Sequence, residues 1–254
     1  MKIQLIRHAT LWLEYGGLKM LVDPMLMDAE SMPAFPNTPN ELRNPGVNLP
    51  ETETDYLKPD LLIVTHTHAD HWDEAAANQL QKDIPLLCQP GDEPIFIKAG
   101  FTDVTPVDVE HEHHSVRFSR TSGQHGTGEI GKRMGKVSGF VLEADEEPVT
   151  YIAGDTIWCD EPATAIKQYK PEVIVVNAGG ARFLQGDPIT MDGPDVAAVK
   201  HAAPSAHLIA VHMDVINHCM TTRADLAAYL AKEQLEDHVL IPMDGESFEF
   251  KLRG

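Results

Sequence analysis

The segment HTHADH, residues 66–71, places four side chains that can bind a metal within six residues of chain. They follow the order His-x-His-x-Asp-His and are His66, His68, Asp70 and His71. Imidazole and carboxylate are common ligands of zinc and similar divalent ions. In an extended segment or a tight loop, this spacing can bring three imidazoles and a carboxylate toward one point. The pattern therefore predicts a metal centre, because a solvated polar loop would need no such spacing.

THTHADH also resembles the HxHxDH signature of the metallo-β-lactamase superfamily, and other stretches match further signatures of that superfamily in order. The resemblance implies that SGQHG supplies His125, that AGDT at 153–156 supplies Asp155, and that AVHMD at 210–214 supplies His212. The implied ligand set, in two groups joined by a bridging Asp155, is His66, His68 and His125 for one ion and Asp70, His71 and His212 for the other.

Three protein ligands and a bridge would leave each ion a position for water, as a catalytic site requires. The resemblance implies a metal-dependent hydrolase that uses a metal-bound hydroxide. We expect two divalent ions, with zinc as the first expectation and manganese, iron or nickel as alternatives. Asp70 is the first candidate to orient the nucleophile and relay a proton. His218 is the second catalytic candidate, and it also competes with His212 for the last ligand position.

Within the superfamily, the early HAT motif and the stretches at 177–180 and 189–200 resemble the ascorbate-6-phosphate lactonase-like branch. The resemblance implies that His8 of the HAT motif lines the pocket. The expected substrate is a small molecule, an ester, lactone or phosphodiester that could be anionic. Three alternatives stay open: a glyoxalase-like thioester hydrolase, a mononuclear lactonase-type enzyme, and a non-catalytic metal-binding or sensing protein.

Two other groups of residues have weaker functional interpretations. EHEHHS, which contains His111, His113 and His114, is better interpreted as a polar strand edge or loop than as a second metal cluster. GTGEIGKRMGK at 126–136 carries three cations, Lys132, Arg133 and Lys136. We expect a solvated loop there that does not open a helix, although these cations could meet an anionic substrate.

The elements that must position these residues are short strands alternating with helices. Apolar runs and alternation predict hairpins over 3–23, ended by Asp23, and the resemblance implies that Asp23 supports the metal loop. Helical patterns are expected at 73–82, 92–99, 160–169, 193–202 and 222–235. This mixture favours two mixed sheets with helices outside, and the resemblance implies a four-layer αβ/βα sandwich of the α/β (α+β) class, in one domain over 1–254. The Pro-rich and Asn-rich segment 24–54 is either a surface excursion or a lid or substrate loop.

Composition restricts the class of protein further. Hydrophobic residues make up 43% and charged residues 23%, which indicates a folded globular chain. The formal charge of −19 disfavours nucleic acid as a partner. No apolar run approaches the ~20 residues of a spanning helix, so we expect no membrane segment. The three separated cysteines and an amino terminus unlike a signal peptide predict a cytoplasmic protein, and a homo-oligomer is compatible with the sequence.

Overall fold

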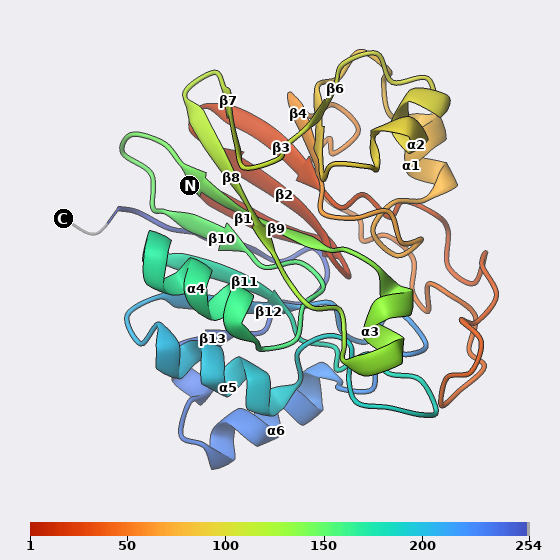
Figure 1. The fold of residues 1–254 in the computed structure, drawn as a ribbon, viewed down its shortest axis with the longest axis vertical. Coiled ribbons are helices and arrows are strands. Elements are labelled where there is room, and N and C mark those ends of the chain that lie inside the picture. The colour runs from red at the N-terminus through yellow and green to blue at the C-terminus, as the bar shows by residue number, and fades with distance from the viewer. Residues whose placement is uncertain (253–254) are drawn as a thin grey trace.

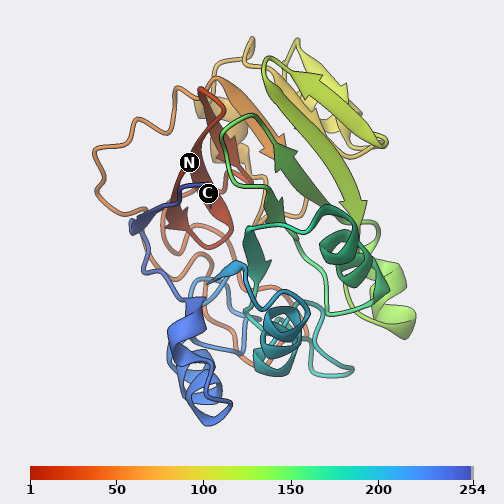
Figure 2. The same cartoon turned by 90° about the vertical axis from the view of Figure 1, so that its left-hand side faces the viewer.

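Two β-sheets lie face to face, and helices cover their outer faces (Figure 1; Figure 2). The computed structural model describes residues 1–252. The first sheet contains β1 (Lys2–Arg7), β2 (Thr10–Tyr15), β3 (Leu18–Val22), β4 (Leu61–Val64), β5 (Leu86–Cys88), β6 (Val104–Pro106) and β14 (Ser247–Glu249). The second contains β7 (Glu110–His113), β8 (Val116–Ser122), β9 (Ser138–Glu143), β10 (Thr150–Ile152), β11 (Val173–Asn177), β12 (His207–Val211) and β13 (Val239–Leu240).

The strand order is β14-β1-β2-β3-β4-β5-β6 in one sheet and β13-β12-β11-β10-β9-β8-β7 in the other. Both sheets mix parallel and antiparallel pairs, as the sequence predicted. The helices are α1 (Glu74–Gln79), α2 (Glu93–Lys98), α3 (Gly128–Met134), α4 (Asp160–Tyr169), α5 (Gly193–Ala202) and α6 (Arg223–Lys232), with a 3₁₀ turn at Glu236–His238. Within residues 1–252, none of these helices has the length and apolar character needed to span a membrane.

The alternation of side chains along the strands produces three apolar layers. In β4, Leu61 and Ile63 join the cluster between the two sheets, whereas Leu62 and Val64 point outward to Ala76 of α1. A corresponding outer cluster packs α4, α5 and α6 against the second sheet. A strand buried on both faces is expected to consist of consecutive apolar residues, and β4 reads LLIV. The four-layer αβ/βα sandwich is therefore confirmed.

The structure contradicts one expectation for local structure, at residues 126–136, and confirms another, around His111 and His113. Residues 128–134 form helix α3, so the prediction that this glycine-rich stretch would not open a helix is wrong. The helix starts after β8 and a short loop. Its apolar periodicity is weak, because Ile130 and Met134 are its only large apolar residues. The polar strand edge predicted around His111 and His113 is confirmed, since β7 is the outermost strand of the second sheet.

The segment 24–54 is fastened to the rest of the protein by buried polar groups. The Arg7 guanidinium, fully buried, donates to the carbonyl oxygens of Met25, Met27 and Val47 at 2.8–2.9 Å. The Asn217 side-chain amide donates to Thr38 Oγ1 at 2.6 Å and accepts from Asn44 Nδ2 at 2.8 Å. A second anchor fixes Phe35, whose N–H donates to Asn217 Oδ1 at 3.0 Å. The segment is thus a fixed wall, which favours the substrate-loop interpretation over a loose surface excursion.

Helix α6 begins with a reciprocal cap between Thr222 and Asp225. Thr222 Oγ1 accepts from the Asp225 N–H at 3.0 Å, and Asp225 Oδ2 accepts from the Thr222 N–H at 3.1 Å. Substituting Thr222→Ala should lower the free energy of unfolding by ~1 kcal/mol, because a first-turn N–H loses its acceptor. Urea denaturation measures this change, and Thr222→Ser should retain most of the stability. Equal stability of all three proteins would contradict the cap.

Candidate metal centre

The His-rich loop follows β4 directly and is held from beneath by Asp23 at the end of β3. Asp23 Oδ1 accepts from the Thr65 N–H at 2.7 Å, and Asp23 Oδ2 accepts from Thr65 Oγ1 at 2.8 Å. The same Oδ2 lies 2.8 Å from His71 Nδ1. Because β3 and β4 are parallel neighbours, their carboxyl ends meet at one edge of the sheet. Asp23 therefore has the supporting place that the sequence implied for it.

The second sheet brings three further residues to the same edge. His125 follows β8, Asp155 follows β10, and His212 follows β12. Two hydrogen bonds hold the first two loops together: Gln124 N–H donates to the side-chain Oγ1 of Thr156 at 3.0 Å, and Ile157 N–H donates to the Gln124 carbonyl at 2.9 Å. All seven residues predicted as ligands are thus gathered at one place. Six of them are buried and His68 is half-buried.

The distances between the ligand atoms fit divalent ions. Around a tetrahedral zinc with bonds of 2.0–2.1 Å, neighbouring ligand atoms lie about 3.4 Å apart. Asp155 Oδ2 lies 3.3 Å from His71 Nε2 and 3.5 Å from His125 Nε2, and His66 Nε2 lies 3.0 Å from His68 Nδ1. His212 Nε2 lies 3.4 Å from both Asp70 Oδ2 and Asp155 Oδ1. Contacts of this length among ligand-type atoms are those expected around bound ions.

Several of the ligands are also oriented from behind, as metal ligands usually are. His125 Nδ1 lies 2.8 Å from the Ile189 carbonyl, which turns its Nε2 inward. Asn177 Nδ2 donates to Asp155 Oδ1 at 2.6 Å. His212 Nδ1 lies 3.4 Å from Cys219 Sγ. Neither Asn177 nor Cys219 was predicted as a supporting group, because neither belongs to a ligand motif.

The charge distribution in the ligand cluster favours the binding of a cation. Burial alone would raise the pKa of Asp155, but His212 and His71 outweigh this effect and hold that pKa well below its usual value. Burial opposes protonation of His71, yet Asp155 and Asp23 raise its pKa well above the ordinary range. Burial, with His71 beside it, lowers the pKa of His66. Ionised carboxylates and neutral imidazoles are the forms that bind metal, so a bound ion would take the place of the proton that Asp155 and Asp23 favour on His71. Within residues 1–252, the ion pairs that Asp23, Asp70 and Asp155 make are with histidines alone.

His8 does not line the pocket over these ligands, although the resemblance implied that it would, and it contacts the ligand set from behind. It is fully buried in the turn between β1 and β2 at φ +61°, a conformation uncommon outside glycine. Its Nε2 lies 3.4 Å from Asp70 Oδ2, and its carbonyl accepts from the His212 N–H at 2.9 Å. Four residues offer ligand atoms within 4.8 Å of one another here, namely His8, Asp70, His71 and His212. A single histidine in a hairpin turn gave no spacing signal that could have revealed this contact.

Removing the His8 side chain should weaken metal binding. We expect His8→Ala to lower the affinity for the ion beside Asp70 roughly 10- to 100-fold, the usual effect of losing a group that orients a ligand. His8→Gln should lose less, because the amide can still donate to Asp70. Competition titration with a chromophoric chelator measures both, with the exposed His201→Ala as control. Unchanged affinity in His8→Ala would show that the contact between His8 and Asp70 does not contribute to metal binding.

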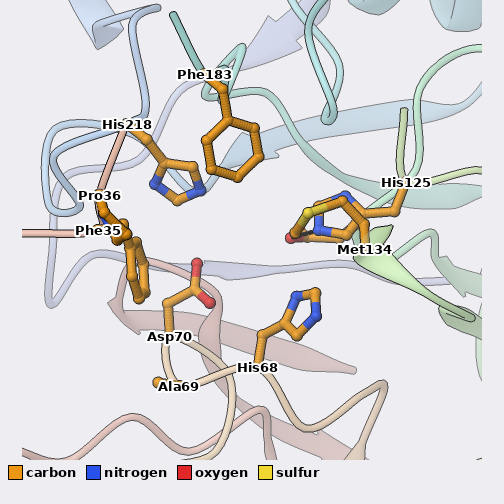
Figure 3. A pocket seen from close by; sticks show the side chains of 10 residues that line it. Phe35, Pro36, His68, Ala69, Asp70, His125, Met134, Phe183 and His218 are labelled. Atoms are coloured by element: carbon orange, nitrogen blue, oxygen red, sulfur yellow. Dashed lines mark ion pairs between the residues drawn. The ribbon is translucent and has the colours of Figure 1, made fainter. Parts of the chain in front are cut away.

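A pocket of about 240 Å³ opens onto the metal centre, and Figure 3 shows its lining. His68, Asp70, His125 and Asp155 contribute the polar part. The remaining lining residues are mostly apolar and are Phe35, Pro36, Ala69, Met134, Phe183 and His218. His218 belongs to this wall and to none of the groups within the described residues that could hold an ion, whereas His212 belongs to one of them.

The His218 ring meets Phe35 edge to face, with the ring centroids 5.1 Å apart. Figure 3 places it with Phe183 on the side of the pocket away from His68. Burial lowers the pKa of His218 to about 4, so the imidazole is neutral at ordinary pH. Its Nδ1 has no hydrogen-bond partner within the described residues.

Comparison with known proteins agrees with this fold. The family model "Beta-lactamase superfamily domain" matches residues 2–212. The UPF0173 protein YddR of Bacillus subtilis is 37% identical over 254 residues, which cover 98% of this chain and 100% of that protein. The chain therefore belongs to the beta-lactamase superfamily, within the group of UPF0173 metal-dependent hydrolases.

Two solved structures are similar over nearly the whole chain. The isothiocyanate hydrolase from Delia radicum gut bacteria is 37% identical with a TM-score of 0.94, covering 99% of this chain and 100% of that one. A protein of Veillonella parvula, described as a possible metal-dependent hydrolase, is 33% identical with a TM-score of 0.94, covering 98% of both chains. The protein is thus an enzyme, a metal-dependent hydrolase with a His/Asp cluster that can hold metal.

Proposed function

We propose that this enzyme hydrolyses isothiocyanates, small uncharged electrophiles of the form R–N=C=S, to an amine and carbonyl sulfide. The observation that carries the proposal is the pairing of a metal-ligand cluster with an apolar wall in one pocket. None of the ten lining residues, all within the described range, is Lys or Arg. A pocket built for an anionic ester or phosphodiester would be expected to offer such a cation. The similarity to the isothiocyanate hydrolase supports the same substrate class.

The proposed ligands are the seven that the sequence implied. His66, His68 and His125 would hold one ion, Asp70, His71 and His212 the other, and Asp155 would bridge them. Zinc fits the nitrogen-rich ligand set first, with manganese, iron or nickel as alternatives. When bound, the metal supplies Lewis acidity, which lowers the pKa of water and polarises the substrate.

The reaction adds one water to the central carbon of the isothiocyanate. The water oxygen forms a bond to that carbon while one water proton passes to nitrogen, which gives a thiocarbamic acid, R–NH–C(=S)–OH. The remaining hydroxyl proton then moves to nitrogen as the C–N bond breaks, and carbonyl sulfide and the amine R–NH2 are released. Asp70 lines the pocket beside His68 and can orient the attacking water through its carboxylate. His218 is neutral and faces the same space, so one ring N–H can donate to the substrate nitrogen or sulfur.

A substrate panel on protein of measured metal content tests the proposal. The panel contains alkyl isothiocyanates, lactones, an aryl phosphodiester and a thioester, and element analysis of the protein as purified counts the ions. We expect amine release from isothiocyanates, two ions per chain, and loss of turnover after dialysis against a chelator, with recovery when the measured metal is restored.

The other outcomes separate the alternatives. Turnover of lactones or thioesters without turnover of isothiocyanates would replace the proposed substrate class. One ion per chain in a fully active protein would favour a mononuclear enzyme. Full activity after complete removal of metal would overturn the role assigned to the ligand cluster.

A further inference from the structure

The pocket over the metal centre continues into a wider surface groove. The groove has a volume of about 540 Å³ and shares Pro36, Met134 and Phe183 with the inner pocket. Figure 3 shows these three side chains at the edge of the inner pocket. The rest of the groove lining is Asn37, Glu129, Ile130, Arg133, Leu184 and Gln185. The two spaces therefore adjoin at these three side chains, on the side of the inner pocket that faces the protein surface.

Helix α3 and the segment after Ala181 form the two walls of the groove. Ile130 packs so closely on Gly186 that a side chain at that glycine would collide with it. The Leu184 N–H donates to the Asn37 carbonyl at 2.8 Å, which ties this segment to the fixed wall described above. Both walls are thus held at a set distance. The backbone hydrogen bond between Leu184 and Asn37 contributes to the shape of the groove independently of side-chain rotamers.

The apolar residues of the groove extend outward from the inner pocket. Met134 and Phe183 lie at the junction, and Ile130 and Leu184 lie further out. Leu184 is 68% exposed, so most of its side chain is open to a ligand or to solvent. The charged residues of the groove, Glu129 and Arg133, are exposed, and Glu129 pairs with Lys132 at 2.6 Å. The groove is therefore apolar along Ile130, Met134, Phe183 and Leu184, with its charges in contact with solvent.

We propose that this groove binds the apolar substituent of the substrate, the R group of R–N=C=S, while the reacting carbon lies over the metal ligands. The inference rests on the proposed function. The inner pocket of about 240 Å³ is below the ~300–1,000 Å³ usual for ligand sites, so it accommodates the reacting group and only a few carbons. A longer alkyl or arylalkyl group must leave it past Met134 and Phe183, and the groove is where that exit leads. The enzyme then prefers substituents long enough to reach Ile130 and Leu184.

A chain-length series tests this preference. Wild-type kcat/KM should rise from methyl through butyl to hexyl isothiocyanate. Leu184→Ala should lower kcat/KM for the hexyl substrate roughly 3- to 10-fold, the effect of removing a few methylene contacts, and leave the methyl substrate unchanged. Leu42→Ala is the matched control, because Leu42 is also 68% exposed, lies in the segment 24–54 and lines neither cavity. It should leave the whole series unchanged.

Binding of n-alkyl hydroxamates tests the groove without any turnover. The hydroxamate binds metal and the alkyl chain reports on the groove, so calorimetry on the metal-loaded protein should show Kd falling from acetohydroxamate to octanohydroxamate. Leu184→Ala should remove most of that gain, and Leu42→Ala none of it. The proposal that the groove binds the substituent would be contradicted by a Kd that does not depend on chain length. It would also be contradicted if Leu184→Ala changed the Kd equally for every chain length. If the protein hydrolyses no isothiocyanate, the proposed function is wrong. The hydroxamate measurement then still shows whether the groove binds apolar chains.

Discussion

Replacing the bridging carboxylate should abolish turnover: we expect Asp155→Asn to lower kcat by on the order of 10³-fold or more. A bound ion contributes several kcal/mol to charge stabilisation, and every 1.36 kcal/mol is a factor of ten in rate. Asp155 lies within 3.3–3.8 Å of four imidazoles, so its loss removes the common neighbour of both ligand groups. Steady-state kinetics and metal content, measured on the same preparation, give the two readouts.

Asp145→Asn is the matched control, since Asp145 is exposed in the turn between β9 and β10. It should match the wild type in both readouts. His66→Ala should behave like Asp155→Asn in kcat, because it removes a ligand of one group. Full activity of either variant with normal metal content would contradict the ligand assignment.

Removing the Arg7 guanidinium should destabilise the protein strongly, although Arg7 lies outside the metal centre. Arg7→Leu keeps much of the side-chain volume but leaves the carbonyl oxygens of Met25, Met27 and Val47 without their donors. A buried polar group without a partner costs about 1–3 kcal/mol, so we expect a loss of roughly 3–5 kcal/mol in the free energy of unfolding. Denaturant titration measures this loss. KM should rise as well, because the segment that carries Phe35 is no longer tied down.

Arg43→Leu separates this effect from the general loss of an arginine. Arg43 donates to the carbonyl oxygens of Glu30 and Ser31 in the same segment, but it is exposed, so water can replace it. It should change stability by less than about 1 kcal/mol. Similar losses in both variants would mean that burial of the Arg7 contacts does not decide their contribution.

The parts of the fold that follow local rules could be predicted from the sequence. The run LLIV before HTHADH predicts a strand that delivers its ligands at one sheet edge, and β4 does so. The ends of β8, β10 and β12 were placed by motifs that each contain one ligand, His125, Asp155 and His212. The ends of strands in different sheets come together only through tertiary packing, which local sequence patterns do not reveal. The grouping of these three residues with the HTHADH ligands was therefore predicted from the order of motifs in the resemblance.

The parts that depend on loop packing could not be predicted. Phe35, Met134 and Phe183 come from three separate segments, and no period or spacing relates them. Helix α3 was not predicted because it is short and contains glycines, which weaken the sequence pattern of a helix. His8 lies at a positive φ in a hairpin turn, next to a register shift between Leu5 and Arg7 in the pairing of β1 with β2. These features come from chain geometry that a one-dimensional pattern does not encode.

The last strand, β14, belongs to the first sheet, where it pairs with β1 and the Phe250 N–H donates to the Met1 carbonyl at 2.9 Å. During synthesis on the ribosome, β1 therefore has an open edge until residues 247–249 have emerged, long after the other six strands of its sheet are available. An open edge can pair with other chains. The nascent protein is consequently exposed to aggregation through β1 for most of its synthesis, and removal of residues 247–250 would make that transient state permanent.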